Sequence, residues 1–281
     1  MESKVAVEGS LSIAYTDLPS KEAGAVTYLL VPGLLDLKSQ YRYLAPLLHR
    51  DGAARVVCAD LRGMGSSDVG FASYTPLDTG KDTVALVNHL GLSRCVLVGS
   101  SMAAASVLWA AAELPGVVTA VVLLGPFAWD HPTGVVMHAL LKLLFLPCWA
   151  AANGAAFHKT LYKDHPPADL DAHVAALKKN LGEPGRANAA SGHVFGLKAP
   201  CAQRMEELRG SPLAVLAVYG TKDPDFPPEG GAGVQKEVDE LLLRLPQAQV
   251  MLVEGAGHYP QTEQPQAVAQ RILEFVAAAS G

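Results

Sequence analysis

The sequence predicts an α/β fold: a mostly parallel, twisted sheet of about eight strands, with helices on both faces and a helical cap insertion. Short apolar runs alternate with helical segments through most of the chain, which is the pattern of a parallel sheet covered on both faces. The alternation stops between residues 125 and 210, where helical patterns continue without a convincing strand. A helical cap between two strands of one sheet is the simplest explanation.

Length and composition fit this prediction. The chain has 281 residues, enough for one large domain with a sizeable core. Hydrophobic residues make up 50% and charged residues 17%, which indicates a globular protein. The formal net charge is −5, and we find no run of basic residues. Because phosphate binding needs clustered Lys and Arg, we do not expect nucleic acid as a partner.

The elements of the sheet layer follow one another in a regular order. An antiparallel pair is expected first, and the parallel strands follow. The predicted strands are Val5–Glu8, Leu11–Tyr15, Thr27–Val31, Val56–Ala59, Cys95–Val98, Val118–Leu124, Ala214–Tyr219 and Gln249–Val253. The predicted helices between them are Ser39–Arg50, Asp82–Leu90, Met102–Glu113, Val234–Leu245 and Pro265–Ala279.

The break in the alternation sets the predicted domain boundaries. Residues 1–125 and 211–281 form the two parts of the core, and residues 126–210 form the cap. Within the cap, Pro and Gly breaks such as HPPAD and GEPGRANAASG separate helices at Val135–Leu146, Asp169–Leu181 and Arg204–Arg209. We expect the cap over the carboxyl ends of the strands, where open α/β sheets place their sites.

Cysteines and apolar segments indicate the compartment. Four cysteines lie far apart without C-x-x-C or paired Cys/His spacing, so we expect reduced thiols and no zinc site: Cys58, Cys95, Cys148 and Cys201. No signal peptide is visible, and we expect a cytoplasmic protein. The longest apolar segment, Val135–Phe157, contains polar and Pro interruptions, so neither a membrane span nor other membrane contact is expected.

The strongest local signal is an apolar strand that runs directly into G-x-S-x-A, with a helix-favouring stretch after it. Gly99, Ser101 and Ala103 occupy the three fixed positions. This approximates the nucleophile elbow, in which a tight strand-to-helix turn exposes a serine hydroxyl and needs small flanking residues. We therefore predict Ser101 as the nucleophile; Ser100 falls one residue early.

A nucleophilic serine needs a base and an acid behind it. His258 follows the last predicted strand in the glycine-rich loop VEGAGHYP, whereas the other eight histidines lie in helix positions or in the cap. Asp223 follows the strand before it, in GTKDPDFP, and Asp225 and Asp130 are the rival acids. The chain order Ser, Asp, His is that of the α/β-hydrolases.

Acyl transfer also needs donors for the developing oxyanion, each contributing roughly 3–4 kcal/mol. We expect one to be the backbone N–H of Met102, directly after the nucleophile. The other is expected to be the N–H of Leu34, in the loop after the third strand, where Gly33 permits a close approach of the backbone.

Taken together, these segments resemble the α/β-hydrolase superfamily, in its serine hydrolase branch with a helical cap. The resemblance covers nearly the whole chain outside the cap and rests on VPGLLD, ADLRGMGSSD, VGSSMA, GTKDPDFP and GAGHYPQTEQP. The chain departs from the family in two places: Pro32-Gly33 replaces His-Gly, and Ala103 ends the elbow instead of Gly. Asp60 and Arg62 usually have a structural role in such proteins.

The resemblance implies a carboxylesterase-like serine hydrolase that cleaves an ester, thioester or lactone of a small to medium apolar molecule, with no metal or other cofactor. Carbon–carbon bond hydrolases, perhydrolases and hydroxynitrile lyases have similar triads, and some slow-turnover hormone receptors share the fold. None of the motifs identifies the substrate or the oligomeric state. Four cap residues are candidates for the substrate pocket: Phe127, Trp129, Met137 and Trp149.

Overall fold

One eight-stranded sheet organises the molecule. The computed structural model describes all residues except 1, 132–142, 144–145, 147–148, 227–232 and 281. The strand order is β1-β2-β4-β3-β5-β6-β7-β8; β2 pairs antiparallel with β1 and β4, and every other pairing is parallel. The prediction of a mostly parallel sheet is confirmed. The strands are β1 Glu2–Glu8, β2 Leu11–Leu18, β3 Thr27–Val31, β4 Arg55–Ala59, β5 Cys95–Ser100, β6 Val118–Leu124, β7 Ala214–Gly220 and β8 Gln249–Val253.

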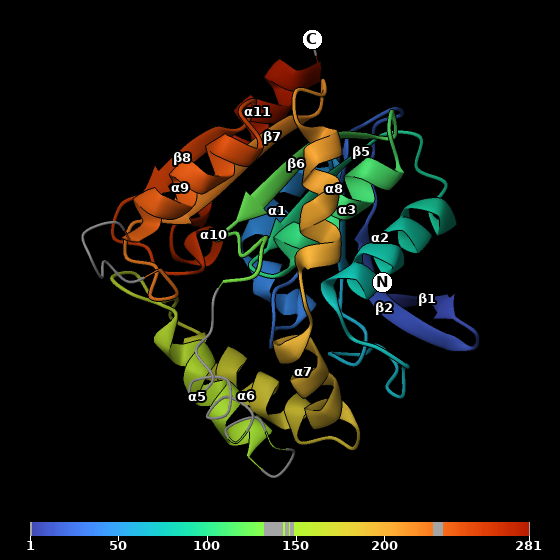
Figure 1. Cartoon of the computed structure of the whole chain (residues 1–281). Coiled ribbons are helices and arrows are strands. Elements are labelled where there is room, and N and C mark those ends of the chain that lie inside the picture. The colour runs from blue at the N-terminus through green and yellow to red at the C-terminus, as the bar shows by residue number, and fades with distance from the viewer. Residues whose placement is uncertain (1, 132–142, 144–145, 147–148, 227–232, 281) are drawn as a thin grey trace.

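Helices cover both faces of this sheet, as Figure 1 shows. Successive strand residues point to opposite faces: in β5, Leu97 belongs to the core on one side and Val98 to the core on the other. The first face packs against α2 Pro76–His89, α3 Ala103–Glu113, α8 Ala199–Leu208 and α9 Gly233–Arg244. The second packs against α1 Leu44–His49 and α11 Pro265–Ser280. Short helices lie at η1 Lys38–Arg42, η2 Arg50–Gly52 and α10 Pro260–Glu263.

Helix α2 begins six residues before its predicted start. Thr75 and Asp78 form a capping box, in which each side chain accepts a hydrogen bond from the other residue's backbone N–H. Pro76 occupies the first turn, where its missing N–H costs nothing. These signals place the start of the helix at Pro76. The predicted start is later because the prediction followed the apolar stripe, which begins after the capping residues.

Three further helices form a layer at one end of the sheet: α5 Ala150–Thr160, α6 Leu170–Leu181 and α7 Arg186–Phe195. Helix α6 was predicted within one residue, whereas α5 was not predicted. The break predicted at GEPGRANAASG is shorter than expected: residues 182–185 separate α6 from α7, but α7 already begins at Arg186 and includes the rest of the segment. Gly192 is tolerated within α7 since a Cβ there would lie 2.9 Å from Tyr74 Cβ. Close packing thus outweighs the low helix propensity of glycine.

The last helix of the predicted cap region, α8, starts five residues before the predicted Arg204 and packs against α3 of the sheet layer. The predicted helix Val135–Leu146 lies mostly outside the described residues. The division into residues 1–125, 126–210 and 211–281 remains a prediction.

Polar and aromatic contacts, some of them buried, attach α5 and α6 to the core. Asp36, three residues after Gly33, lies with its Oδ1 2.9 Å from Nε2 of His173 on α6. Arg42 of η1 donates two hydrogen bonds to Asp169, at the start of α6. His158 of α5 contacts the ring of Tyr259, which directly follows His258. The segments that carry the expected oxyanion donor and base therefore also hold these helices.

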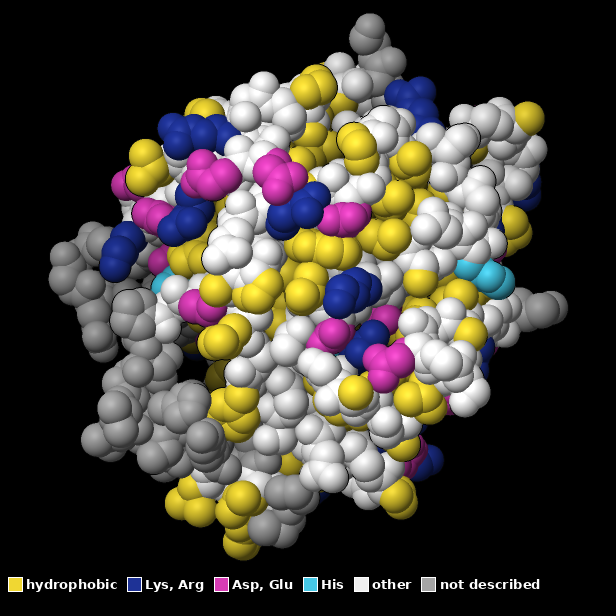
Figure 2. All heavy atoms as spheres, turned by 45° about the vertical axis from the view of Figure 1, so that its right-hand side comes forward, with side chains coloured by type: hydrophobic (Ala, Val, Ile, Leu, Met, Phe, Trp, Pro, Cys, Tyr) yellow, Lys and Arg dark blue, Asp and Glu magenta, His cyan; other side chains and the backbone are white. Residues whose placement is uncertain are grey.

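The surface offers two plain observations. On the face shown in Figure 2, basic and acidic side chains are interspersed rather than gathered by sign. Among the described residues, none of the helices is both long and apolar enough to cross a bilayer.

The contact between β5 and α3 generates a stability prediction. A Cβ on Gly99 would lie 2.6 Å from the carbonyl oxygen of Ala103 and 2.6 Å from Val107 Cγ2. We expect Gly99→Ala to lower the free energy of unfolding by about 1–3 kcal/mol, the usual range for overpacking, as measured by urea denaturation. Gly182→Ala is the matched control, because its new Cβ would meet neighbours at 3.4 Å or more. Equal effects of the two substitutions would contradict the prediction.

Candidate active site

Three predicted residues follow three strands at the same edge of the sheet. Ser101 follows β5, Asp223 lies just beyond β7, and His258 lies in the loop after β8. These strands are parallel within one sheet, so their carboxyl ends meet at one edge, where α/β sheets bind ligands. The topology therefore brings together residues that are far apart in the sequence.

Ser101 lies on a sharp strand-to-helix turn. Its φ angle is 52°, in the left-handed region that a residue other than glycine adopts at a cost of about 1–2 kcal/mol. The Ser101 N–H donates to the carbonyl of Leu124 on neighbouring β6, at 2.8 Å, and Phe127 N–H donates to the Ser101 carbonyl, at 3.1 Å. The fold thus holds a strained conformation in place, as the elbow prediction requires.

His258 is oriented by a buried carboxylate. Its Nδ1 lies 2.8 Å from Oδ2 of Asp223, and both side chains are almost completely buried. The His258 backbone N–H donates to the carbonyl of Leu161, at 2.8 Å, which anchors the loop. The second oxygen of Asp223 accepts the N–H of Asp225, at 3.0 Å. Asp223 therefore has one oxygen for the imidazole and one for its own loop.

Asp225, the rival acid, is close to the same imidazole but is not equivalent. Its Oδ2 lies 3.6 Å from His258 Nδ1, and its side chain is 25% exposed. Burial, followed by the charge of Asp223, raises the pKa of Asp225, while His258 opposes the shift. The geometry therefore favours Asp223 as the direct partner, with Asp225 as a second nearby negative charge.

These carboxylates control the charge of the imidazole. Burial alone would lower the pKa of His258, but the negative charges of Asp223 and Asp225 outweigh burial and raise it to about 9. The protonated ring is thus strongly stabilised in the folded protein. A base with this environment accepts a proton readily.

The expected oxyanion donors lie beside the nucleophile. A Cβ on Gly33 would be 2.8 Å from Ser101 Cβ, so only glycine lets this loop pass so close to the serine. Leu34 and Met102 both line the cavity that contains Ser101. Among the described residues, neither backbone N–H donates a hydrogen bond to another loop or turn group. Both remain available to a developing oxyanion.

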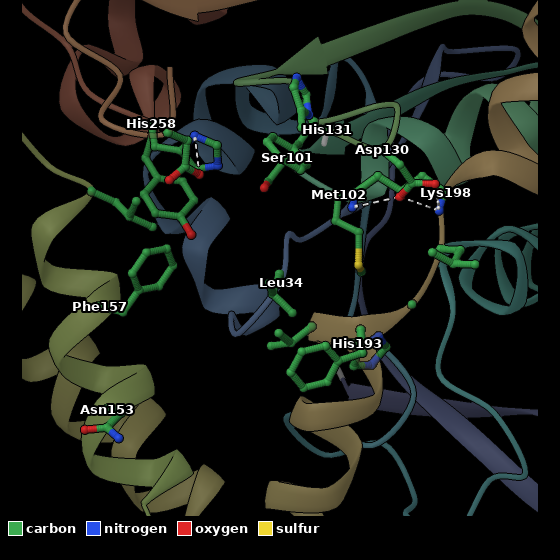
Figure 3. Close-up of a pocket in the computed structure, with 18 residues that line it drawn as sticks. Leu34, Ser101, Met102, Asp130, His131, Asn153, Phe157, His193, Lys198 and His258 are labelled. Carbon is green, nitrogen blue, oxygen red and sulfur yellow. Dashed lines mark hydrogen bonds and ion pairs between the residues drawn. The ribbon is translucent and has the colours of Figure 1, made fainter. Parts of the chain in front are cut away.

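Ser101 and His258 face one cavity of about 510 Å³. Figure 3 shows the Ser101 hydroxyl directed toward the side of the cavity on which the His258 ring lies. No hydrogen bond between the two side chains is found in the described part of the chain. The described lining is largely apolar and includes Leu34, Met102, Phe127, Phe157, Leu161, Val194, Phe195 and Leu197.

Of the four residues predicted for the substrate pocket, one is found in the cavity lining. Phe127 lines the cavity, whereas Trp129 is buried under the guanidinium of Arg244 and Trp149 is 56% exposed. Neither tryptophan is among the described lining residues, and Met137 lies outside the described residues. Sequence reasoning missed Phe157 and Leu161, because α5 was not predicted. It also missed the polar residues that line the cavity at several places: Asp130, His131, Asn153, His193 and Lys198.

Among the described residues, two groups of side chains have donor types and spacing that a metal ion could use. One is Asp223, Asp225 and His258, described above; the other is Asp36 in the loop after β3, His158 of α5 and His173 of α6. Burial lowers the pKa of His158 to about 4, so its ring is neutral at pH 7.

Of the cysteines, Cys58, Cys95 and Cys201 are free and buried, and Cys148 lies outside the described residues.

The comparisons with known proteins agree on one family. The family model described as "Alpha/beta hydrolase family" matches residues 28–271. A curated relative, the uncharacterised hydrolase YugF of Bacillus subtilis, is 25% identical over 264 residues, with 90% of each chain covered. An esterase from Thermogutta terrifontis has a similar structure, with a TM-score of 0.74, 22% identity and 99% of both chains covered. A bromoperoxidase from Bacillus anthracis gives a TM-score of 0.79 at 16% identity, with 99% and 100% covered.

The environment of His258 generates a titration prediction. We expect its ring to titrate near pH 9 in NMR spectra, and Asp223→Asn to lower this pKa, because the largest favourable charge is removed. Asp225→Asn should lower it less. Since the folded pKa is above the usual 6.5, this histidine stabilises the fold fully below about pH 6.5, and the contribution is lost as pH rises through about 9. An unchanged titration in Asp223→Asn would contradict the assigned pairing.

Proposed function

Since this chain belongs to the alpha/beta hydrolase family, we propose that it is a serine hydrolase that cleaves an ester-type bond through an acyl-enzyme at Ser101. The observation that carries the proposal is the shared cavity: a serine in a strained left-handed turn and a histidine paired with a buried aspartate line the same space. The family membership supports hydrolysis as the reaction class. The esterase among the structural neighbours supports the fold on which that chemistry is built.

In the proposed reaction, His258 takes the proton of Ser101 as the hydroxyl oxygen attacks the carbonyl carbon of an ester, thioester or lactone. The Nδ1 side of the ring remains held by Asp223, whose charge stabilises the imidazolium. The N–H groups of Leu34 and Met102 receive the developing negative oxygen. His258 then protonates the leaving group as its bond to the carbonyl carbon breaks, which leaves the acyl group on Ser101.

Deacylation repeats these roles with water as the nucleophile. His258 removes a proton from the water, the acyl–oxygen bond to Ser101 breaks, and the serine recovers its proton. Since the ring must be neutral to accept a proton and its pKa is about 9, kcat/KM should rise with pH up to about pH 9. The apolar lining favours a small to medium apolar acyl or alcohol group.

The first kinetic prediction concerns the nucleophile. Ser101→Ala should lower kcat by roughly 10⁴–10⁶-fold on a chromogenic short-chain ester, because the attacking oxygen is lost. It should also abolish labelling by a fluorophosphonate probe. Ser100→Ala is the matched control, since the Ser100 hydroxyl is fully buried near Gln40 and Gln261. Turnover by Ser101→Ala equal to that of the unmodified protein would remove the assignment.

The second prediction separates the two acids. Asp223→Asn should lower kcat by about 10⁴-fold, because the imidazole loses the partner that fixes its tautomer. Asp225→Asn should have a clearly smaller effect, since its carboxylate lies farther from Nδ1 and is partly exposed. If Asp225→Asn is the more damaging change, Asp225 is the acid.

A panel of p-nitrophenyl esters, lactones and a vinylogous diketone distinguishes ester hydrolysis from carbon–carbon bond cleavage on the same residues.

A further inference from the structure

The largely apolar cavity contains a lysine. Lys198, directly before α8, lines the cavity with Ser101 and His258, and its side chain is only 12% exposed. Figure 3 shows Lys198 and Asp130 on the wall across from His258. Burial lowers the pKa of this lysine, although Asp130 opposes the shift. Placing an ammonium group here costs free energy that its surroundings must offset.

The nearest carboxylate satisfies the helix rather than the ammonium. The oxygens of Asp130 accept hydrogen bonds from the backbone N–H groups of Lys198 and Ala199, at 2.9–3.1 Å. Asp130 thereby acts as the cap of α8, an arrangement that helix N-termini favour for carboxylates. The Lys198 Nζ is 3.8 Å from Asp130 Oδ1, beyond hydrogen-bond distance. The ion pair is therefore loose.

The other contact that described residues make with the ammonium is with an aromatic ring. Lys198 Nζ lies 4.7 Å from the centroid of Phe127, a favourable but non-directional interaction. In the described part of the chain, no side-chain or backbone oxygen accepts a hydrogen bond from Nζ. Among the residues that the structure describes, a partly desolvated ammonium thus has unused donors, in the wall of the cavity that holds the proposed nucleophile.

We propose that Lys198 forms an anion subsite, so that the substrate carries a carboxylate on the part of the molecule that fills this cavity. The inference rests on the proposed serine hydrolase function and narrows its substrate class to apolar esters with an acidic end. A carboxylate would take up the unused donors of Nζ, and the apolar lining would contact the chain between the acid and the ester. Asp225, the other carboxylate of the described lining, lies on the His258 side of the cavity, with its Oδ2 3.6 Å from Nδ1 of His258.

Two chromogenic esters of equal acyl length test this subsite: p-nitrophenyl hexanoate and mono-p-nitrophenyl adipate, which differ by a terminal carboxylate. Lys198→Met should lower kcat/KM for the adipate ester by roughly 10- to 100-fold, the range for losing a hydrogen bond to a charged group. The loss should lie mainly in KM, and the hexanoate value should change by less than about threefold. Lys198→Arg should retain most of the preference because it keeps the charge.

Asp130→Asn is the complementary variant. An asparagine side chain still caps α8, but the competing charge beside Nζ is gone, so kcat/KM for the adipate ester should rise relative to the hexanoate ester. If Lys198→Met leaves the ratio of kcat/KM for the two esters unchanged, whether both values fall equally or neither falls, the lysine has no role in recognising a carboxylate and the proposal is overturned.

A binding measurement separates this proposal from the proposed function. In the Ser101→Ala background, calorimetry should show tighter binding of monomethyl adipate than of methyl hexanoate, and Lys198→Met should remove the difference. If the unmodified protein hydrolyses neither p-nitrophenyl ester but this binding preference is present, the hydrolase assignment fails and the subsite stands. If esters are hydrolysed and no preference is found, the subsite fails and the hydrolase stands.

Discussion

The structure depends on the close contact between β5 and α3. The strand and the helix approach so closely at Gly99 that even one methyl group would collide with the backbone of Ala103. That approach makes the chain turn within Ser101, whose left-handed φ is the consequence. Gly33 extends the same constraint, because the loop with the expected oxyanion donor passes directly against Ser101. Close packing of the backbone at Gly99 and Gly33 thus places the Ser101 hydroxyl at the carboxyl end of β5.

Electrostatics then distinguishes two carboxylates that are two residues apart. Asp223 is fully buried and divides its oxygens between the imidazole and the N–H of Asp225. Asp225 is partly exposed and lies farther from the ring. Both charges raise the pKa of His258, against the effect of burial. Both carboxylates therefore stabilise the imidazolium of His258, whereas only Asp223 is positioned to orient the ring.

The sheet, and the places of the three residues predicted as catalytic, could be predicted from the sequence because their signals are local. Apolar runs define the strands, and Ser101, Asp223 and His258 each lie in the turn or loop that follows one. Helices α5 and α7 lack such signals: α5 is rich in alanine without a clear apolar stripe, and α7 contains Gly192, which only its packing against Tyr74 explains. Lys198 was also out of reach, since its significance comes from burial beside Phe127, far away in the sequence.

The contacts that hold α5 and α6 also connect them to the site. Asp36, which meets His173 of α6, lies two residues after Leu34, so the expected oxyanion loop and the anchor of α6 are one short segment. Tyr259 packs against His158 of α5 and directly follows His258. The carbonyl that holds the His258 N–H belongs to Leu161, which follows α5 and lines the cavity. A substrate that shifts α5 would therefore act directly on the segments that carry the proposed base and the expected oxyanion donor. Helix α5, which lines the cavity through Asn153 and Phe157, is thus linked to the proposed catalytic residues as well as to the pocket.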